Sequence, residues 1–430
     1  MVAADFEKTL PSSQNITRVE LENGLIVLVF EKPDVQSVVV TGSMPAGSAN
    51  DTPETAGLAA MTAEATTRGT ANRDFDALHT ELEMLGADFD VDGGRFKTGF
   101  GGKALAEDLP TLVDIMNDVL RNPTFPEQQV ERLRGEVLTT LNYYQQDTRY
   151  RARRAFYEAL YPDGNPLHYS SSGTIETISS LTVANLREFH SSYFGPQGTV
   201  VVIVGNVKAD DAVDIVRGKM SDWQNPNQQG MAAIPDAPTI AEAQRVFTPV
   251  AGKTQSDLIM GFVGPNRHAD DYHAARLANA VLGQFGMMGR IGTVVREEKG
   301  YAYYSRSGLD GGYANGAWSA FAGIKPENVE ETIEDITHEF KRISTEAVTD
   351  EDLDNVQSYF TGSLPLGLES NEGVASTILR MEGYNLGLDY LLGYRDMIWS
   401  LTKDDLLQAA ANYINVDKLT ISVAGPEKGL

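Results

Sequence analysis

Arg296 and Tyr303 stand seven residues apart, on either side of Gly300, in the segment Val-Arg-Glu-Glu-Lys-Gly-Tyr-Ala-Tyr. The charged run before Gly300 has helical spacing, glycine is a natural left-handed helix stop, and the run after it favours a strand. A guanidinium and a phenol flanking such a turn can converge on a peptide carbonyl and on the oxyanion that water attack creates. The alternative is an arginine paired at the surface with Glu297 or Glu298 and a half-buried strand tyrosine. The residues alone favour this alternative.

Three glycines at intervals of three, Gly283, Gly286 and Gly289, precede this segment. One interpretation is a flexible loop whose backbone approaches an extended peptide, so that the glycines bind substrate. The other is a tight turn between helices that packs in the core, with Met287 and Met288 filling gaps. The sequence does not separate the two interpretations.

Side chains that ordinarily bind metals are sparse. The chain has 6 histidines and no cysteine, which excludes disulfides, thiol catalysis and thiolate metal sites. His268 and His273 lack the i, i+4 spacing of a helical metal pair, and the other histidines are isolated in the sequence. We therefore assign no histidine to a metal.

Composition limits the class of protein. At 430 residues and 42% hydrophobic, the chain can bury a large core and is long enough for two or more domains. A net charge of −25 repels phosphate backbones and anionic membranes, so nucleic acid is not an expected partner. No apolar run approaches the roughly 20 residues of a membrane helix, and no signal peptide is visible. We expect a soluble protein, in the bacterial cytoplasm rather than the periplasm.

The two halves of the chain repeat one another at an offset of 220 residues. Each copy places Ser-Leu-Thr before an amphipathic helix that ends near a tyrosine, followed by an apolar strand closed by glycine. We expect these strands at 199–204 and 419–424. The matched pairs are Ile178 and Ile398, Ser180 and Ser400, Leu181 and Leu401, Thr182 and Thr402, Leu186 and Leu406, Tyr193 and Tyr413, and Gly205 and Gly425.

The repeat predicts an α+β fold of two homologous modules, each a largely antiparallel sheet packed with helices. Residues 223–239 are rich in Asn, Gln, Pro and Gly without periodicity, which indicates a linker. The expected domains are an N-terminal module at 1–222, a linker at 223–240 and a C-terminal module at 241–430.

Periodicity and turn residues predict the individual elements. The strand at 21–30, with its turn at Asn23-Gly24, is expected to pair with the strand at 37–44. The pairs Gly93-Gly94 and Gly101-Gly102 are expected in hairpin turns, because a phosphate loop would need Gly-Lys-Ser/Thr after them. A further strand is expected at 255–262, and helices at 75–85, 109–120, 126–145, 149–160, 271–282, 329–346 and 349–363.

Two motifs resemble the insulinase/pitrilysin-type metallopeptidases, a family of inverted zincins. The segment that begins at Leu282 and continues through Arg296 and Tyr303 is similar, in order and spacing, to the signature L-G-G-G-x-x-S-R-L…V-R-E-x-x-G-L-A-Y. Residues 57–70 resemble the frame G-L-A-H-F-L-E-H-M-L-F-K-G-T, and with the linker and the repeat the resemblance covers nearly the whole chain. The matching positions of the frame are Gly57, Leu58, Ala59, Gly69 and Thr70.

The zinc ligands of that family are missing at the resembling positions. In the H-x-x-E-H motif two His bind Zn²⁺ and the Glu polarises the attacking water; here Ala60 and Glu64 stand at the His positions and Ala63 at the base. The third ligand is a Glu in a run similar to E-R-E-R-G-V-I-L-R-E-I, and the run from Glu131 places Thr140 there. A threonine hydroxyl is a poor zinc ligand beside a carboxylate. The resemblance therefore implies that this chain holds no metal.

What the resemblance implies is a zinc-free subunit of a heterodimeric zinc peptidase, similar to the zinc-free partners of bacterial heterodimeric peptidases and to the alpha subunit of mitochondrial processing peptidase. A homologous partner with H-x-x-E-H would hold the zinc, and Arg296 and Tyr303 would act on it in trans. The glycines at 283, 286 and 289 would hold an unfolded peptide substrate, as the glycine-rich loop of that alpha subunit is held to do. The chain would be inactive alone and contribute to metalloendopeptidase activity in the complex.

The alternative function is a non-catalytic structural or peptide-binding protein, like the core subunits of respiratory complex III. Retention of the Arg296 and Tyr303 pair weighs against it, because a structural protein has no need of both. Independent hydrolysis without zinc has no visible constellation of residues to perform it.

Overall fold

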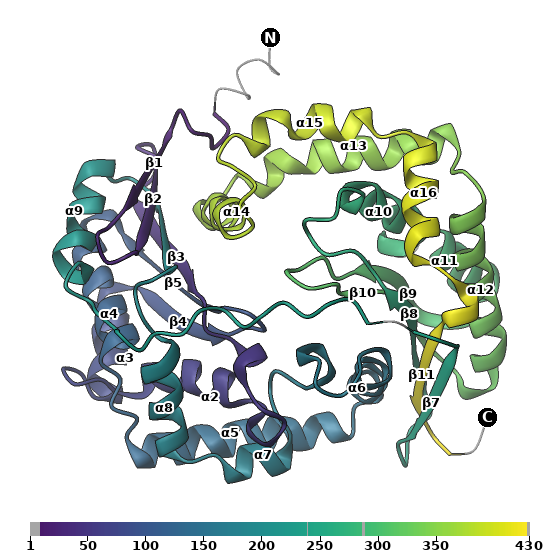
Figure 1. Cartoon of the computed structure of the whole chain (residues 1–430), viewed down its shortest axis with the longest axis horizontal. Helices are drawn as coiled ribbons and strands as arrows, with labels where there is room; N and C mark the ends of the chain where they lie inside the picture. The colour runs from purple at the N-terminus through teal and green to yellow at the C-terminus, as the bar shows by residue number, and fades with distance from the viewer. Residues whose placement is uncertain (1–8, 239, 286–288, 428–430) are drawn as a thin grey trace. The chain divides into compact units, whose positions relative to one another are not determined.

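The structure is a computed structural model that describes residues 9–238, 240–285 and 289–427. It divides into two compact units, each built on one sheet (Figure 1). Unit 1 comprises the residues up to Thr139, Ser170–Ala233 and Ser363–Tyr394. Unit 2 comprises Thr140–Tyr169, Ile234–Gly362 and the residues from Arg395 onward. Each unit therefore contains a segment from the other half of the chain.

The sheet of unit 1 has six strands in the order β1-β2-β6-β3-β5-β4. The pair β2 and β6 is parallel, and the other neighbouring pairs are antiparallel. Strand β6 is buried along its whole length, and a continuous β-branched run of this kind favours a central position between two strands. The bounds are β1 (Ile16–Glu20), β2 (Ile26–Glu31), β3 (Ser37–Met44), β4 (Asp88–Gly93), β5 (Thr98–Leu105) and β6 (Val200–Gly205).

The sheet of unit 2 has five strands in the order β7-β11-β8-β10-β9. Its single parallel pair is β7 and β11, and the rest is antiparallel. This order reproduces β2-β6-β3-β5-β4 of unit 1, strand for strand. The predicted fold of two homologous, largely antiparallel α+β modules is confirmed. The bounds are β7 (Gln244–Pro249), β8 (Ser256–Val263), β9 (Ala302–Leu309), β10 (Ala317–Ile324) and β11 (Thr420–Gly425).

Helices pack against both sheets, and most of the predicted ones are found within two residues of their expected ends. Those of unit 1 are α2 (Leu58–Ala65), α3 (Phe75–Leu85), α4 (Leu109–Arg121), α7 (Ile175–Ser180), α8 (Val183–Tyr193), α9 (Ala209–Met220) and α14 (Asn371–Gly383). Those of unit 2 are α6 (Thr148–Leu160), α10 (Tyr272–Asn279), α11 (Arg290–Gly292), α12 (Val329–Thr345) and α16 (Lys403–Tyr413), with the π-helices η6 (Ala280–Gln284) and η8 (Thr293–Glu298). Three helices cross a boundary between the units: α5 (Glu127–Gln145), α13 (Asp350–Gly367) and α15 (Tyr390–Ser400).

The repeat predicted from the sequence has a local physical basis. Helices α8 and α16 begin at Thr182 and Thr402, whose hydroxyls accept the backbone N–H of Asn185 and Asp405. The side chains of Asn185 and Asp405 accept the N–H of the two threonines in return, so both helices start with a capping box. The expected caps and the strands that follow them are confirmed.

One helix of each module covers the sheet of the other. Helix α6, from the first half of the chain, packs on β8 and β11, and α14, from the second half, packs on β3 and β6. Phe156 of α6 shares a buried cluster with Ile259 and Ala424, and Ile378 of α14 shares one with strand β6. The compact units exchange these two segments, and the chain passes from unit 1 to unit 2 between Ala233 and Ile234. The domain bounds of 1–222, 223–240 and 241–430 stay a prediction.

Two local expectations are wrong. The turn at Asn23-Gly24 joins β1 to β2, but β2 does not pair with β3, because β6 lies between them and pairs with both. Gly93-Gly94 does form the β4–β5 turn, whereas Gly101-Gly102 lies inside β5. A Cβ at Gly102 would stand 2.2 Å from the Asp88 carbonyl oxygen, so close approach of two strands explains this glycine.

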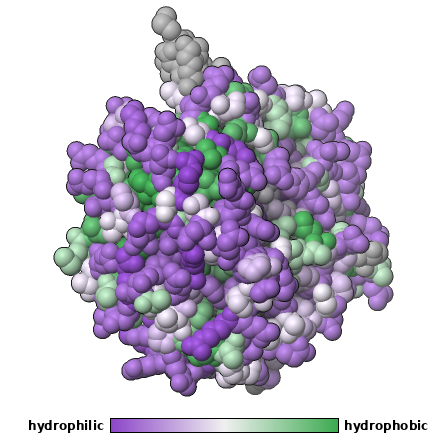
Figure 2. Space-filling model, turned by 60° about the vertical axis from the view of Figure 1, so that its left-hand side comes forward, coloured by the Kyte–Doolittle hydropathy of each residue, from purple (hydrophilic) through white to green (hydrophobic). Residues whose placement is uncertain are grey.

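The polar composition of the chain is visible at its surface. Hydrophilic residues cover most of the face in Figure 2, and hydrophobic residues form separate groups among them. Among the helices of the described residues, none has both the length and the apolar character needed to cross a membrane.

Candidate functional site

Helix α2 is fully formed at the positions where the zinc motif of the resembling family would lie. Gly57 takes a left-handed conformation (φ 94°) just before it, a conformation that glycine adopts readily. The carboxylate of Asp51 accepts the backbone N–H of Gly57 at 3.0 Å and of Ala59 at 3.1 Å, which satisfies donors that a helix start leaves unpaired. Packing and this cap hold α2 in place.

The individual positions on α2 offer no metal ligand set. Ala60 packs against β4 so closely that a Cβ at Gly93 would lie 2.5 Å from its Cα, and Ala63 is buried. Glu64 is exposed, and its pKa is raised by partial desolvation and then by the charge of Asp92. Thr140 lies on α5 at the start of the segment that belongs to unit 2. Within the described residues, no group of three or more His, Cys, Asp or Glu side chains could hold a metal ion.

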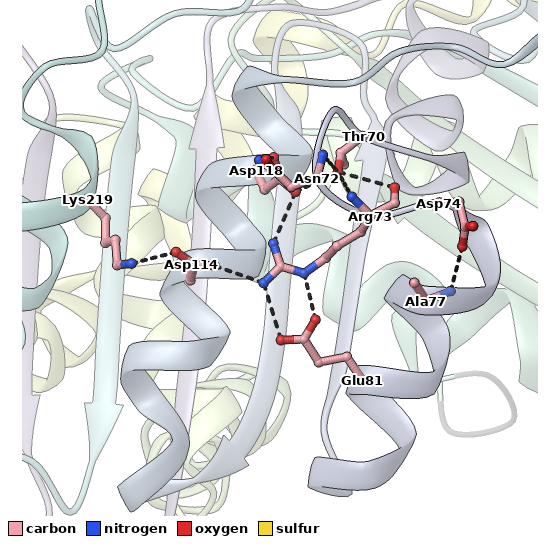
Figure 3. Close-up of polar contacts among 9 residues, drawn as sticks. All are labelled: Thr70, Asn72, Arg73, Asp74, Ala77, Glu81, Asp114, Asp118 and Lys219. Carbon is pink, nitrogen blue, oxygen red and sulfur yellow. Dashed lines mark hydrogen bonds and ion pairs between the residues drawn. The ribbon is translucent and has the colours of Figure 1, made fainter.

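The turn after α2 is held by a partly buried ionic network (Figure 3). The Arg73 guanidinium bonds to Glu81 at 2.6 Å, to Asp114 at 2.8 Å and to Asp118 at 3.1 Å. Asp118 is buried and also accepts the Thr70 hydroxyl at 2.5 Å. Thr70, the last residue of the family-like frame, therefore has a structural role that ties the end of this segment to α4.

The segment from Arg296 to Tyr303 adopts the local structure predicted for it. The π-helix η8 contains Arg296, Gly300 is left-handed with φ 66°, and β9 contains Tyr303. Gly300 N–H donates to the Arg296 carbonyl at 3.1 Å, and Tyr301 N–H donates to the Val295 carbonyl at 3.0 Å. These two bonds close the helix end and direct the chain into the strand.

Both side chains of the pair are open to solvent. Arg296 is exposed, and Tyr303 is 66% exposed. No hydrogen bond or ion pair joins either side chain to another described residue, Glu297 and Glu298 included. The pair thus differs from the surface-paired, half-buried alternative, and its donors are available to a ligand.

Helix α12 anchors the turn between the two residues. Lys299 bonds to Glu331 and Asp335, both at 2.8 Å, and the Tyr301 hydroxyl donates to Glu331 at 3.0 Å. Hydrogen bonds to Asp335 and Glu331 raise the pKa of Lys299. Arg290, just before η8, bonds to Asp352 of α13 at 3.3 Å. These contacts fix the backbone from which Arg296 and Tyr303 project.

Two of the three predicted substrate-binding glycines are explained by packing. Gly283 and Gly289 are buried, and a Cβ at Gly289 would lie 2.5 Å from the Gly283 Cα. A Cβ at Gly283 would lie 2.9 Å from the Ser307 nitrogen. Gly286, with Met287 and Met288, falls outside the described residues. Substrate binding by these glycines stays a prediction.

One charged cluster was not singled out from the sequence. Arg149 and Arg153, one turn apart on α6, line a pocket of unit 2 together with Arg306 of β9. Two arginines at i, i+4 in an acidic chain are a weak signal for such a site, because the third arginine comes from a distant segment.

Comparisons with known proteins identify the fold and the family. Residues 26–173 match the family described as Insulinase (Peptidase family M16), and residues 180–360 match the Peptidase M16 inactive domain. An uncharacterized zinc protease of Streptomyces coelicolor is 26% identical over 419 residues, covering 96% of this chain and 90% of that protein. The crystal structure of a peptidase M16 inactive domain from Pseudomonas fluorescens is similar with a TM-score of 0.87 and 26% identity, over 96% of this chain and 98% of that one. The periplasmic protease PqqL from Escherichia coli is similar in fold, with a TM-score of 0.82 and 16% identity, over 97% of this chain but 46% of that longer one. This chain belongs to peptidase family M16.

Proposed function

We propose that this chain is the zinc-free subunit of a heterodimeric zinc peptidase, and that it supplies Arg296, Tyr303 and half of a peptide-binding chamber. The observation that carries the proposal is a contrast between two segments. Helix α2 folds and packs without a metal ligand set at Ala60, Ala63 and Glu64. The Arg296 and Tyr303 side chains are exposed, with no partner among the described residues.

The pair has the chemistry that peptide hydrolysis needs from a second subunit. A Zn²⁺ ion in the partner would polarise the scissile carbonyl and lower the pKa of the attacking water. The Arg296 guanidinium and the Tyr303 hydroxyl are hydrogen-bond donors for the peptide carbonyl, and they stabilise the negative charge that develops on its oxygen. The contacts of Lys299 and Tyr301 with α12 fix the backbone from which these donors project before substrate binds.

The comparison with PqqL supports the pairing. The fold of this chain corresponds to 46% of the PqqL chain. That single longer polypeptide therefore contains roughly twice the matched length. In the proposed heterodimer, the two modules of this chain form one half, and a homologous second chain with H-x-x-E-H forms the other half.

The test combines metal analysis with reconstitution. The purified chain should bind no stoichiometric zinc and cleave no peptide alone, but should support cleavage when mixed with an M16 chain from the same organism that carries H-x-x-E-H. Arg296→Ala and Tyr303→Phe should each lower kcat of the mixture by roughly 10²–10³-fold, the effect of losing one oxyanion donor. Complex formation, followed by size-exclusion chromatography, should be unchanged.

Arg395→Ala is the matched control, because Arg395 is exposed on α15. A tightly held equivalent of zinc in this chain would contradict the interpretation of α2. If both substitutions leave turnover of the mixture untouched, the non-catalytic alternative, a structural or peptide-binding protein like the core subunits of respiratory complex III, replaces the proposal.

A further inference from the structure

A pocket of about 270 Å³ in unit 2 lies between α6 and the strands β8, β9 and β10. Three arginines line it, Arg149 and Arg153 from α6 and Arg306 from β9, together with the carboxyl groups of Asp257 and Asp310. All three arginines are exposed, so their guanidinium groups are accessible from solvent. The cluster is unusual in a chain with a net charge of −25.

The two carboxylates of the pocket already have other donors. Asp257 is 3% exposed and accepts the hydroxyls of Thr148 and Tyr304. Asp310 accepts the Tyr157 hydroxyl. Among the described residues, no ion pair joins either carboxylate to one of the three arginines. Hydroxyl donors thus take up acceptor positions on both carboxylates that would otherwise be available for direct ion pairs with the guanidinium groups.

Aromatic rings orient the arginines. The Arg149 guanidinium stacks 4.1 Å from the centre of the Tyr304 ring and donates from Nε to its hydroxyl at 3.0 Å. The Arg153 guanidinium lies 5.7 Å from the centre of the Tyr157 ring. The Arg306 guanidinium lies 5.6 Å from the centre of the Phe321 ring. The Arg149 stack holds a guanidinium plane and leaves edge N–H donors for a planar anion, and the other two arginines lie within the roughly 6 Å range of a cation–π contact.

Charge and size select the ligand. The ionised groups of the lining carry three positive and two negative charges, so a monoanion neutralises the pocket, whereas a phosphate dianion exceeds its charge. A carboxylate also matches the fork of an arginine. The volume is slightly below the ~300 Å³ at which sites for whole small molecules begin, which suits one side chain or one chain end.

We propose that this pocket binds a carboxylate of a peptide, either its C-terminus or an acidic side chain. That the carboxylate belongs to a peptide rests on the proposed function. The pocket would then give the chain a preference among peptides that is separate from the Arg296 and Tyr303 pair.

The experiment uses the full chain alone and fluorescence anisotropy with labelled peptides. One pair of peptides shares a sequence without Asp or Glu and ends in a free carboxylate or an amide; a second, amidated pair carries Glu or Gln at one position. The wild type should bind one carboxylate form at least about tenfold more tightly than its neutral counterpart, and the pair that discriminates identifies the source. The double substitution Arg153→Gln and Arg306→Gln should abolish the preference.

Arg395→Gln should retain the preference, and unchanged urea midpoints should verify that all variants fold. Equal affinity for charged and neutral peptides, no binding of either, or a preference that survives the double substitution would overturn the proposal. Displacement of the peptide by inorganic phosphate at lower concentration than by acetate would also overturn it, in favour of a phosphate site. Because no zinc subunit is present, each of these outcomes is independent of the reconstitution test of the proposed function.

Discussion

Helices α6 and α14 occupy equivalent places in the two modules, yet they meet their sheets with opposite charge. In unit 1, α14 brings carboxylates to cations on the strands, Glu372 to Lys103 at 2.7 Å and Glu382 to Arg18 at 2.8 Å. In unit 2, α6 brings Arg149 and Arg153 to a sheet whose carboxylates are bonded to hydroxyls.

The difference indicates that the charged contacts of α14 have a structural role, whereas the arginines of α6 are placed to bind a ligand. Direct pairing leaves the charges of α14 and its sheet satisfied within the protein. On α6 the arginines face aromatic rings instead, so cationic donors remain for a ligand. The same sheet order thus supports a closed helix contact in one unit and an open, positively charged pocket in the other.

The largest effect is expected from removing the apolar anchor of each exchanged helix. Phe156 and Ile378 are fully buried, so Phe156→Ala should destabilise by about 3–5 kcal/mol and Ile378→Ala by about 2–5 kcal/mol. Urea unfolding measures both, with Arg153→Gln and Glu372→Gln as exposed controls on the same helices. A loss under about 1 kcal/mol for only one of them would mean that the two helices are not equivalent supports.

The next comparison is between Arg73, which is paired with three carboxylates, and Arg306, which forms no ion pair within the described residues. Arg73→Ala leaves Asp118 buried without its cation, and should cost about 3 kcal/mol. Arg306→Ala removes no ion pair and should change stability by less than about 0.5 kcal/mol. Equal losses in urea unfolding would contradict the distinction between a structural network and a binding pocket.

A pH dependence of stability is expected from Asp51, which stands 220 residues before Asp271 of the other module. Asp271 accepts the Tyr413 hydroxyl at 2.8 Å, and burial, followed by the charge of Asp51, raises the pKa of Tyr193. Burial raises the pKa of Asp51 from 3.8 to about 7. The folded protein therefore keeps a proton at Asp51 in a pH range where the unfolded chain has released it.

Stability contributed by this proton is fully present below about pH 4 and is lost as pH rises to about 7. The urea midpoint of the wild type relative to Asp51→Asn should accordingly fall between these values and level off above them. Parallel curves for wild type and Asp51→Asn across this range would show that the Asp51 proton is not linked to folding.

The smallest effect is expected from the exposed pairs of unit 1. Lys103 and Glu372 have side chains that are 48% and 49% exposed, so Glu372→Gln should cost less than about 1 kcal/mol, and less still at high salt. Peptide binding in unit 2 should not change. A loss above 2 kcal/mol in urea unfolding would show that direct pairing contributes more to the α14 contact than its exposure indicates.

Much of the fold could be predicted because its signals are local. The Thr182 and Thr402 caps, the left-handed Gly300 and the apolar run of β6 each depend on a few neighbouring residues. For the same reason the turn between Arg296 and Tyr303 can be predicted without knowledge of its surroundings.

The rest depends on contacts between distant segments. Two similar sheets present similar apolar faces to α6 and α14, and periodicity does not encode which helix covers which sheet. Gly102 resembled a turn residue because its strand partner at Asp88 cannot be recognised locally. The arginine pocket was missed because α6, β8 and β9 come together only in the folded chain.

The exchange of helices also sets the order in which the protein can be completed on the ribosome. Strand β6 ends at Gly205, but the helix that covers it ends at Gly383. Roughly 180 further residues must be synthesised before α14 can cover β6, which takes roughly 10–35 s at ordinary rates of synthesis. During that interval the face of the first sheet that α14 covers stays exposed, and exposed apolar surface of this kind makes a nascent chain prone to aggregation.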